Sequence, residues 1–473
     1  MNSGIEDKSK KMKKKILFFT ICLFANLAFA QQRDDKLLFS EFDKILSDQY
    51  KTNETGATAL VARKGQIIYK KAFGMANLEY NIPMQVDNIF KIGSITKQFT
   101  AVAILQLVEQ GKLNLQDDIT KFIPDYPTQG HKITIEHLLT HTSGIQNYTE
   151  MKDFEYRMSL DFNPSEFLNH FKNQPMESAP GTKWNYNNSG YFLLGYVIEK
   201  ISGKTYPQYV EENFFKPLGM TSSLYGSDSK IIKNRAGGYD KDSIGVVNAP
   251  KLSMTQPYSG GSIQSTVDDL FKWHQAIHSY KLLKKESLDK AFKKYKLTDG
   301  TETDYGFGWF LKNVQESPTI EHSGGISGFL TQSIYLPKED VFVAVFSNCM
   351  CNLPMAIGVN IAALTIGKPY KYKEIPVEFS RLEGYLGVYE NIKGEQLFIT
   401  IEDNQLYSQQ SGDTKFKLKA FQKDKFFIEN MMTTIEFSVN NKGEIEKLQK
   451  KGRSGNEVWN KTNNLTPTEF ERK

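Results

Sequence analysis

Residues 90–97 read Phe-Lys-Ile-Gly-Ser-Ile-Thr-Lys and open a long apolar run. Its periodicity predicts a helix that ends just before the stop signal Gly111. One helical turn separates Ser94 from Lys97, so both side chains project from one face and the lysine Nζ can reach the serine Oγ. A serine hydroxyl is a weak nucleophile until a neighbouring base or positive charge activates it. The pair therefore predicts an activated nucleophile.

The surroundings of Ser94 distinguish it from other serines with the same spacing. Ser-x-x-Lys recurs at Ser227 and Ser287, so the tetrapeptide alone is weak evidence. Only Ser94 begins a long apolar periodicity and is followed by two further motifs. These motifs are Tyr186-Asn187-Asn188 and His322-Ser323-Gly324.

The three motifs occur in a known order. The chain resembles the penicillin-recognising serine hydrolases, a superfamily of class C β-lactamases, DD-peptidases, D-aminopeptidases and esterases. It has the class C variants, with Tyr-x-Asn second and His-x-Gly third. Further matching stretches are Leu138 to Gly144, Tyr305 to Trp309, and Gly324 through Gly328-Phe329, so the resemblance spans roughly residues 55 to 350.

The resemblance implies a role for each motif residue. Ser94 would accept the acyl group, and Lys97 and Tyr186 are the two candidate bases, which would share a proton if they touch. The substrate-binding residues would be Asn188, His322, Ser323 and Gly324, and the backbone N–H groups of Ser94 and Gly325 would form the oxyanion hole. His322 replaces a lysine of many relatives, so its charge is expected to titrate near the unperturbed pKa of about 6.5.

Each of these residues also has a structural interpretation. Ser94 could be a simple helix cap and Lys97 a solvated side chain. Tyr186 could be a core aromatic residue with Asn188 in a turn, and His322 a hydrogen-bonded strand histidine. The co-occurrence of the three motifs favours the catalytic interpretation.

The first thirty residues predict a secretory signal peptide. Lysines between Lys8 and Lys15 precede an apolar segment from Ile16 to Leu27, and Ala28-Phe29-Ala30 forms a small-residue cleavage site. The apolar segment is short for a membrane span. We therefore expect cleavage after Ala30, export to the periplasm or beyond, and no stable membrane insertion of the mature chain; an uncleaved anchor is the alternative.

The net charge and the cysteine content limit which partners the mature chain is expected to bind. Residues 1–30 hold six lysines against Glu6 and Asp7, a net charge of +4, so the +5 of the whole chain leaves +1 after cleavage. Such a chain has no basic field for nucleic acid. The remaining cysteines, Cys349 and Cys351, flank a single residue, where a mutual disulfide would strain the backbone. They are predicted to be buried thiols, with metal binding second.

The chain predicts two domains after the signal peptide. Residues 31–368 carry all three motifs, and a Lys- and Tyr-rich linker up to Pro376 leads to residues 376–473. There, short alternating segments between turn signals predict a small antiparallel barrel or sandwich, similar to the lipocalin-like modules of some D-aminopeptidase relatives. Its predicted segments run from Leu382–Tyr389 to Glu457–Trp459. The fold class is α+β, with an antiparallel sheet flanked by helices, a helical insert and a C-terminal barrel.

Rival classes lack their motifs. His274 and His278 have helical spacing, but Gln275 stands where a zinc protease has glutamate. Gly-x-Ser-x-Gly, the α/β-hydrolase signature, is absent from the sequence. Neither a metal nor a cofactor is expected.

The predicted function is therefore that of an exported serine hydrolase that forms an acyl-Ser94 intermediate. Its substrate would be a small molecule or short peptide with a D-amino-acyl amide, peptide or ester bond. A class C-type β-lactamase, or a β-lactam or peptidoglycan sensor that does not turn over, is the alternative, and the oligomeric state is left open.

Overall fold

The computed structural model describes residues 35–410, 414–428 and 431–463. The predicted signal peptide lies outside these residues. Among the helices of the described part, none is long and apolar enough to cross a membrane.

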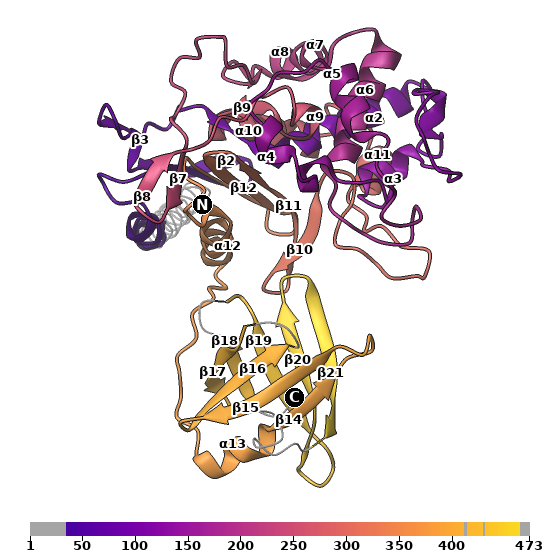
Figure 1. The fold of residues 1–473 in the computed structure, drawn as a ribbon. Coiled ribbons are helices and arrows are strands. Elements are labelled where there is room, and N and C mark those ends of the chain that lie inside the picture. The colour runs from indigo at the N-terminus through magenta and orange to yellow at the C-terminus, as the bar shows by residue number, and fades with distance from the viewer. Residues whose placement is uncertain (1–34, 411–413, 429–430, 464–473) are drawn as a thin grey trace, which may run out of the picture.

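The N-terminal part, which carries the three motifs, is built on one antiparallel sheet (Figure 1). Its strands, in spatial order, are β10 (Phe310–Val314), β11 (Ser317–Ile326), β12 (Phe329–Leu336), β13 (Val341–Ser347), β1 (Ala57–Arg63) and β2 (Gln66–Phe73). Lys64 and Gly65 both have positive φ, as the tight turn between β1 and β2 requires. β1 pairs with β2, and β12 with β13, as antiparallel hairpins.

Helices fill the chain between β2 and β10. They are η1 (Gly93–Ile95), α2 (Thr96–Glu109), η2 (Ile119–Lys121), α3 (Ile135–Leu139), η3 (Tyr148–Glu150), α4 (Phe154–Arg157), α5 (Pro164–Phe171), α6 (Asn188–Ser202), α7 (Tyr206–Val210), η4 (Glu211–Phe215), α8 (Lys216–Leu218), α9 (Tyr258–Gly261), α10 (Val267–His278) and α11 (Lys285–Ala291). Small sheets join them: β3 (Met75–Asn77) with β4 (Ile82–Pro83), β5 (Phe90–Lys91) and β6 (Leu224–Tyr225) on either side of β9 (Ile263–Ser265), and β7 (Tyr239–Asp242) with β8 (Gly245–Asn248).

The central strands separate two hydrophobic cores. Along β13, Val341, Val343 and Val345 enter one core, whereas Phe342, Ala344 and Phe346 enter the other. This division follows from the two-residue period of a strand. A helix over residues 35–49 and α12 (Pro354–Thr365) contribute to the first core, and the helical insert to the second (Figure 1). The predicted α+β architecture with a helical insert is confirmed.

The C-terminal part is a closed barrel of eight antiparallel strands. They are β14 (Gly387–Glu390), β15 (Gln396–Glu402), β16 (Gln405–Gln410), β17 (Phe416–Gln422), β18 (Lys425–Ile428), β19 (Thr434–Val439), β20 (Ile445–Gly452) and β21 (Gly455–Asn463). The predicted strand over Leu382–Tyr389 is wrong in its first half, where α13 (Phe379–Tyr385) lies. Leu382 and Tyr385 of this helix pack into the barrel core with Trp459, so burial and not strand pairing accounts for their apolar pattern.

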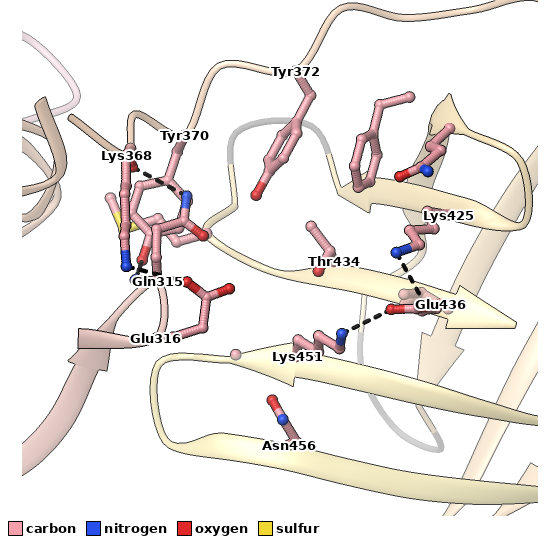
Figure 2. Close-up of a pocket in the computed structure, with 15 residues that line it drawn as sticks. Gln315, Glu316, Lys368, Tyr370, Tyr372, Lys425, Thr434, Glu436, Lys451 and Asn456 are labelled. Carbon is pink, nitrogen blue, oxygen red and sulfur yellow. Dashed lines mark hydrogen bonds and ion pairs between the residues drawn. The ribbon is translucent and has the colours of Figure 1, made fainter. Parts of the chain in front are cut away.

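The barrel meets the N-terminal part beside β10 (Figure 1). A cavity of about 470 Å³ lies between them, lined by Gln315 and Glu316 on one side and by strands of the barrel on the other (Figure 2). Lys425 and Lys451 both pair with Glu436 in its wall. These pairs are partly exposed, so each stabilises the fold by at most about 1 kcal/mol.

A buried contact links the barrel to the main sheet more firmly. Arg453, in the β20–β21 turn, pairs with Glu321 of β11, whose side chain is only 5% exposed. The arginine Nε also donates to the Asn313 carbonyl at 3.0 Å, and the Asn313 N–H donates back to the Arg453 carbonyl at 2.7 Å. The barrel thereby contacts the strand that carries the third motif.

The two cysteines form a disulfide, so the prediction of buried thiols is wrong. The intervening Met350 makes a turn that places the two Cα atoms 5.1 Å apart, within the range that disulfides span. The sequence spacing alone did not reveal this turn, which bridges to Tyr239 of β7.

We predict that Arg453→Ala destabilises the protein by about 3 kcal/mol, because it leaves the buried Glu321 carboxylate unpaired. Urea unfolding followed by circular dichroism measures this loss. Lys451→Ala, which breaks a partly exposed pair on the same hairpin, is the matched control and should cost about 1 kcal/mol or less. Equal losses for the two variants would contradict a special role for the Arg453–Glu321 pair.

Candidate active site

Ser94 and Lys97 lie together at the start of the first long helix. Ser94 is in the 3₁₀ turn η1, and Lys97 is in the first turn of α2. The lysine Nζ is 3.1 Å from the serine Oγ. The helical spacing in the sequence therefore predicted this contact correctly.

Lys97 has no exposed surface, and its amine has three neighbours. Besides Ser94, these are the Asn188 Oδ1 and the Gly260 carbonyl, each 2.9 Å from Nζ. Those two oxygens only accept hydrogen bonds, so a neutral amine gives them both of its N–H groups. Its lone pair then faces the Ser94 hydroxyl.

Burial also favours the neutral form of this amine. Desolvation lowers the pKa of Lys97 to about 7. A substantial fraction of Lys97 is therefore unprotonated at neutral pH and able to accept the serine proton.

The second motif lies at the start of α6. Asn187 caps this helix by accepting a hydrogen bond from the Gly190 N–H at 2.9 Å. Asn188 follows as the first helical residue, and its Nδ2 donates to Thr149 Oγ1 at 3.3 Å. The cap and this bond orient the Asn188 carboxamide toward Lys97.

His141 holds the backbone of the same turn by a hydrogen bond. Its Nδ1 accepts a hydrogen bond from the Asn187 N–H at 3.0 Å, and its ring lies 4.3 Å from that of Tyr186. Burial, reinforced by the nearby Lys97 and His322, holds the pKa of His141 well below 6.5. A neutral imidazole therefore positions the Tyr186-Asn187-Asn188 turn, a role that the sequence analysis did not assign.

Tyr186 presents its ring, and not its hydroxyl, to Lys97. The lysine Nζ is 4.8 Å from the ring centroid. Burial raises the pKa of Tyr186 well above 10, opposed by a weaker interaction with the Ser94 side chain. Within the described residues its buried hydroxyl has no hydrogen-bond partner of normal geometry. The contact needed for a proton shared with Lys97 is not made, so Lys97 is the better placed base.

His322 does not titrate near 6.5, so that prediction is wrong. Burial, with a smaller contribution from Lys97, lowers its pKa to about 3. Its Nδ1 lies 2.6 Å from the Ser323 carbonyl, to which it must donate, and its Nε2 lies 2.9 Å from the Tyr305 hydroxyl, from which it accepts. His322 is thus a neutral histidine that fixes the start of the motif on β11.

The third motif brings β11 against the nucleophile turn. A Cβ on Gly324 would lie 2.0 Å from the Ile92 carbonyl, and one on Gly93 would lie 3.0 Å from the Gly325 nitrogen. Only glycines permit this approach, and Gly93 also has a positive φ of 51°. The contact places the Gly325 backbone beside that of Ser94, as an oxyanion hole requires.

The β10 strand does not extend along this part of β11. It pairs with Ser317 to Glu321, and no strand of the described residues lies beside His322 to Ile326 on that side. A cavity of about 380 Å³ opens beside this edge and contains Ser94, Asn188 and Gly325. Ser323 and Gly324 do not line this cavity. Most of its other lining side chains are apolar: Phe154, Met158, Pro250, Leu252, Pro257, Ile326 and Met350.

Gly260 is a further site residue that sequence reasoning missed. Its carbonyl accepts from Lys97, and a Cβ there would lie 3.6 Å from Nζ. A backbone acceptor has no side chain that could mark its role in the sequence.

Comparison with known proteins agrees with this geometry. A family model described as Beta-lactamase matches residues 38–366. The chain belongs to this family. A second model, described as Domain of unknown function (DUF3471), matches residues 371–472 and so covers the barrel.

Members and neighbours of the Beta-lactamase family cover most of the chain. Penicillin-binding protein 4* of Bacillus subtilis (strain 168) is 29% identical over 411 residues, which are 82% of this chain and 91% of that protein. The octameric penicillin-binding protein homologue from Pyrococcus abyssi is similar in structure, with a TM-score of 0.63 and 28% identity over 89% of this chain and 99% of that one. A D-stereospecific amidohydrolase from Streptomyces sp. has a TM-score of 0.60 and 25% identity over 69% and 98%.

We predict that kcat/KM for a neutral p-nitrophenyl ester rises about tenfold per pH unit up to about pH 7 and then stays level, because only neutral Lys97 accepts the proton. Stopped-flow or steady-state assays between pH 5 and 9.5 measure the profile. The His322→Gln variant is the control, and its profile should keep the same midpoint since His322 is neutral throughout. A decline between pH 7 and 9.5, or a midpoint that moves in His322→Gln, would contradict this assignment.

Proposed function

We propose that this protein is an exported serine hydrolase that forms an acyl-Ser94 intermediate on D-aminoacyl amides, peptides or esters. The observation that carries the proposal is the Lys97 amine, buried beside the Ser94 hydroxyl with both of its neutral N–H groups engaged elsewhere. This arrangement fits a general base that activates a nucleophile.

Acylation begins when the Ser94 Oγ attacks the substrate carbonyl carbon and its proton passes to Lys97 Nζ. The carbonyl oxygen becomes an oxyanion, which the N–H groups of Ser94 and Gly325 stabilise. Collapse of the tetrahedral intermediate breaks the bond to the leaving amine or alcohol. Asn188 holds Lys97 in place during this step and can bind the substrate amide.

The leaving group needs a proton, and Tyr186 is suited to relay it. Its burial keeps the phenol protonated, and its hydroxyl is free for a substrate heteroatom. Tyr186 donates its proton to the departing nitrogen or oxygen. Because its hydroxyl does not touch Lys97, the proton of the Lys97 ammonium returns to it through an intervening water molecule, which restores both groups. Water then attacks the acyl-Ser94 carbonyl, with Lys97 again as base, and releases the acid.

The cavity favours an acyl donor without a carboxylate near the scissile bond. Its lining residues include no lysine, arginine or histidine in the described part of the chain. Since His322 is neutral, it supplies no positive charge to the carboxylate of a β-lactam. The D-stereospecific amidohydrolase among the structural neighbours supports the same substrate class. We therefore propose β-lactamase activity as the second candidate.

We predict that Ser94→Ala abolishes turnover of p-nitrophenyl esters and D-alanine p-nitroanilide and leaves no acyl adduct by intact-protein mass spectrometry. Its stability should fall by only about 1 kcal/mol, because a small polar side chain is lost. Parallel assays with nitrocefin rank the alternatives. Faster turnover of nitrocefin than of the D-alanine substrate would favour the β-lactamase, and a lasting acyl adduct without turnover would favour the sensor. Residual ester activity within tenfold of wild type would place the nucleophile elsewhere.

Export is part of the proposal and has its own test. The Cys349–Cys351 disulfide supports it, because disulfides persist in oxidising compartments outside the cytosol. We expect amino-terminal sequencing of the exported protein to begin near Gln31. A chain that still carries Lys13 to Lys15 would contradict cleavage after Ala30.

A further inference from the structure

One charged side chain lines the cavity that contains Ser94. It is Asp240, on the second residue of β7, and the remaining lining residues are polar or apolar but uncharged. We propose that Asp240 binds the ammonium group of the substrate, so that the site selects acyl donors with a free amine. This inference rests on the proposed hydrolase function and specifies its substrate class.

The direction of Asp240 follows from its neighbour in the strand. The Tyr239 hydroxyl accepts a hydrogen bond from the Leu78 N–H at 2.8 Å, so the tyrosine points away from the cavity toward the β3–β4 ribbon. Successive side chains of a strand point to opposite faces. Asp240 therefore faces the cavity side, where Met350 and Ser327 also lie.

The backbone of β7 next to Asp240 is hydrogen-bonded to the segment that contains the Cys349–Cys351 disulfide. The Tyr239 N–H donates to the Asn348 carbonyl at 2.9 Å, and the Met350 N–H donates to the Tyr239 carbonyl at 3.1 Å. Cys349 and Cys351 close the turn around Met350. The two hydrogen bonds and the disulfide fix the positions of Asp240 and Met350 on the same wall of the cavity.

The same wall packs closely on the strand of the oxyanion hole. The Gly238 backbone approaches Gly328, in the β11–β12 turn, so closely that a Cβ on Gly328 would lie 2.7 Å from the Gly238 Cα. Gly328 also has a positive φ of 84°. The turn lies three residues beyond Gly325, so Asp240 is held at the end of the strand that binds the scissile carbonyl.

Asp240 is also available for a cationic partner. One carboxylate oxygen accepts the Lys241 N–H at 2.8 Å, which leaves the other oxygen for a ligand. In the described part of the chain, no lysine, arginine or histidine lies within 4.0 Å of it. A carboxylate on an otherwise uncharged wall attracts an ammonium and repels a carboxylate.

The test compares D-alanine p-nitroanilide with its N-acetyl derivative, in which an uncharged acetamide replaces the ammonium group. Asp240→Asn should lower kcat/KM for the free amine about tenfold or more, mainly through KM, and change the N-acetyl substrate less than twofold. Asp228→Asn, which removes an exposed carboxylate outside the cavity, is the matched control and should leave both substrates unchanged. Thermal unfolding of each variant checks that the fold is intact.

A charge reversal keeps the proposal testable if the first variant folds poorly. Asp240→Lys should favour N-succinyl-D-alanine p-nitroanilide over the free amine. An unchanged ratio of the two D-alanine substrates in both variants, with wild-type activity intact, would overturn the role of Asp240 alone. Failure of wild type to acylate Ser94 with any of these substrates would instead overturn the proposed hydrolase.

Discussion

The active site depends on the complete burial of one amine. Lys97 of α2 loses its hydration and receives in return the Gly260 carbonyl from α9 and the Asn188 carboxamide from α6. An isolated buried ammonium would be costly, so these acceptors and the lowered pKa of Lys97 belong together. The three residues are far apart in the chain. The helical insert must therefore be packed before Lys97 is held beside Ser94 as its proposed base. The contacts of Lys97 with Asn188 and Gly260 thus belong both to the folded core and to the proposed reaction.

The main sheet completes the site through backbone contacts. Because Gly93 and Gly324 have no side chain, β11 lies close enough to the nucleophile turn for the Gly325 N–H to act beside that of Ser94. β10 pairs with only the first half of β11, and Gly325 and Ile326 of the second half line the cavity that contains Ser94. The barrel contacts the first half through Arg453 and Glu321. It can therefore brace the strand without closing the cavity.

The sequence predicted features that depend on local periodicity. Ser94 and Lys97 are one helical turn apart, and the barrel strands are short alternating segments between turn signals. Both features could therefore be recognised along the chain. The predicted charge of His322 was wrong because Tyr305 and the packing around it, which keep the ring neutral, come from other elements. The Cys349–Cys351 disulfide and the Gly260 acceptor were missed for a similar reason. Each depends on a turn or a carbonyl that tertiary structure alone positions.

Burial also determines which charges a substrate meets. Burial lowers the pKa values of His141 and His322 and raises that of Tyr186, so each of the three side chains is neutral at neutral pH. None of them adds a fixed charge near Ser94. The ammonium of Lys97 is present for part of the time and becomes fully formed only when it takes the serine proton. In the proposed acylation, a positive charge thus develops next to the reacting atoms as the oxyanion develops on the substrate. Such a site stabilises the transition state more than the bound neutral substrate, which is the requirement for catalysis.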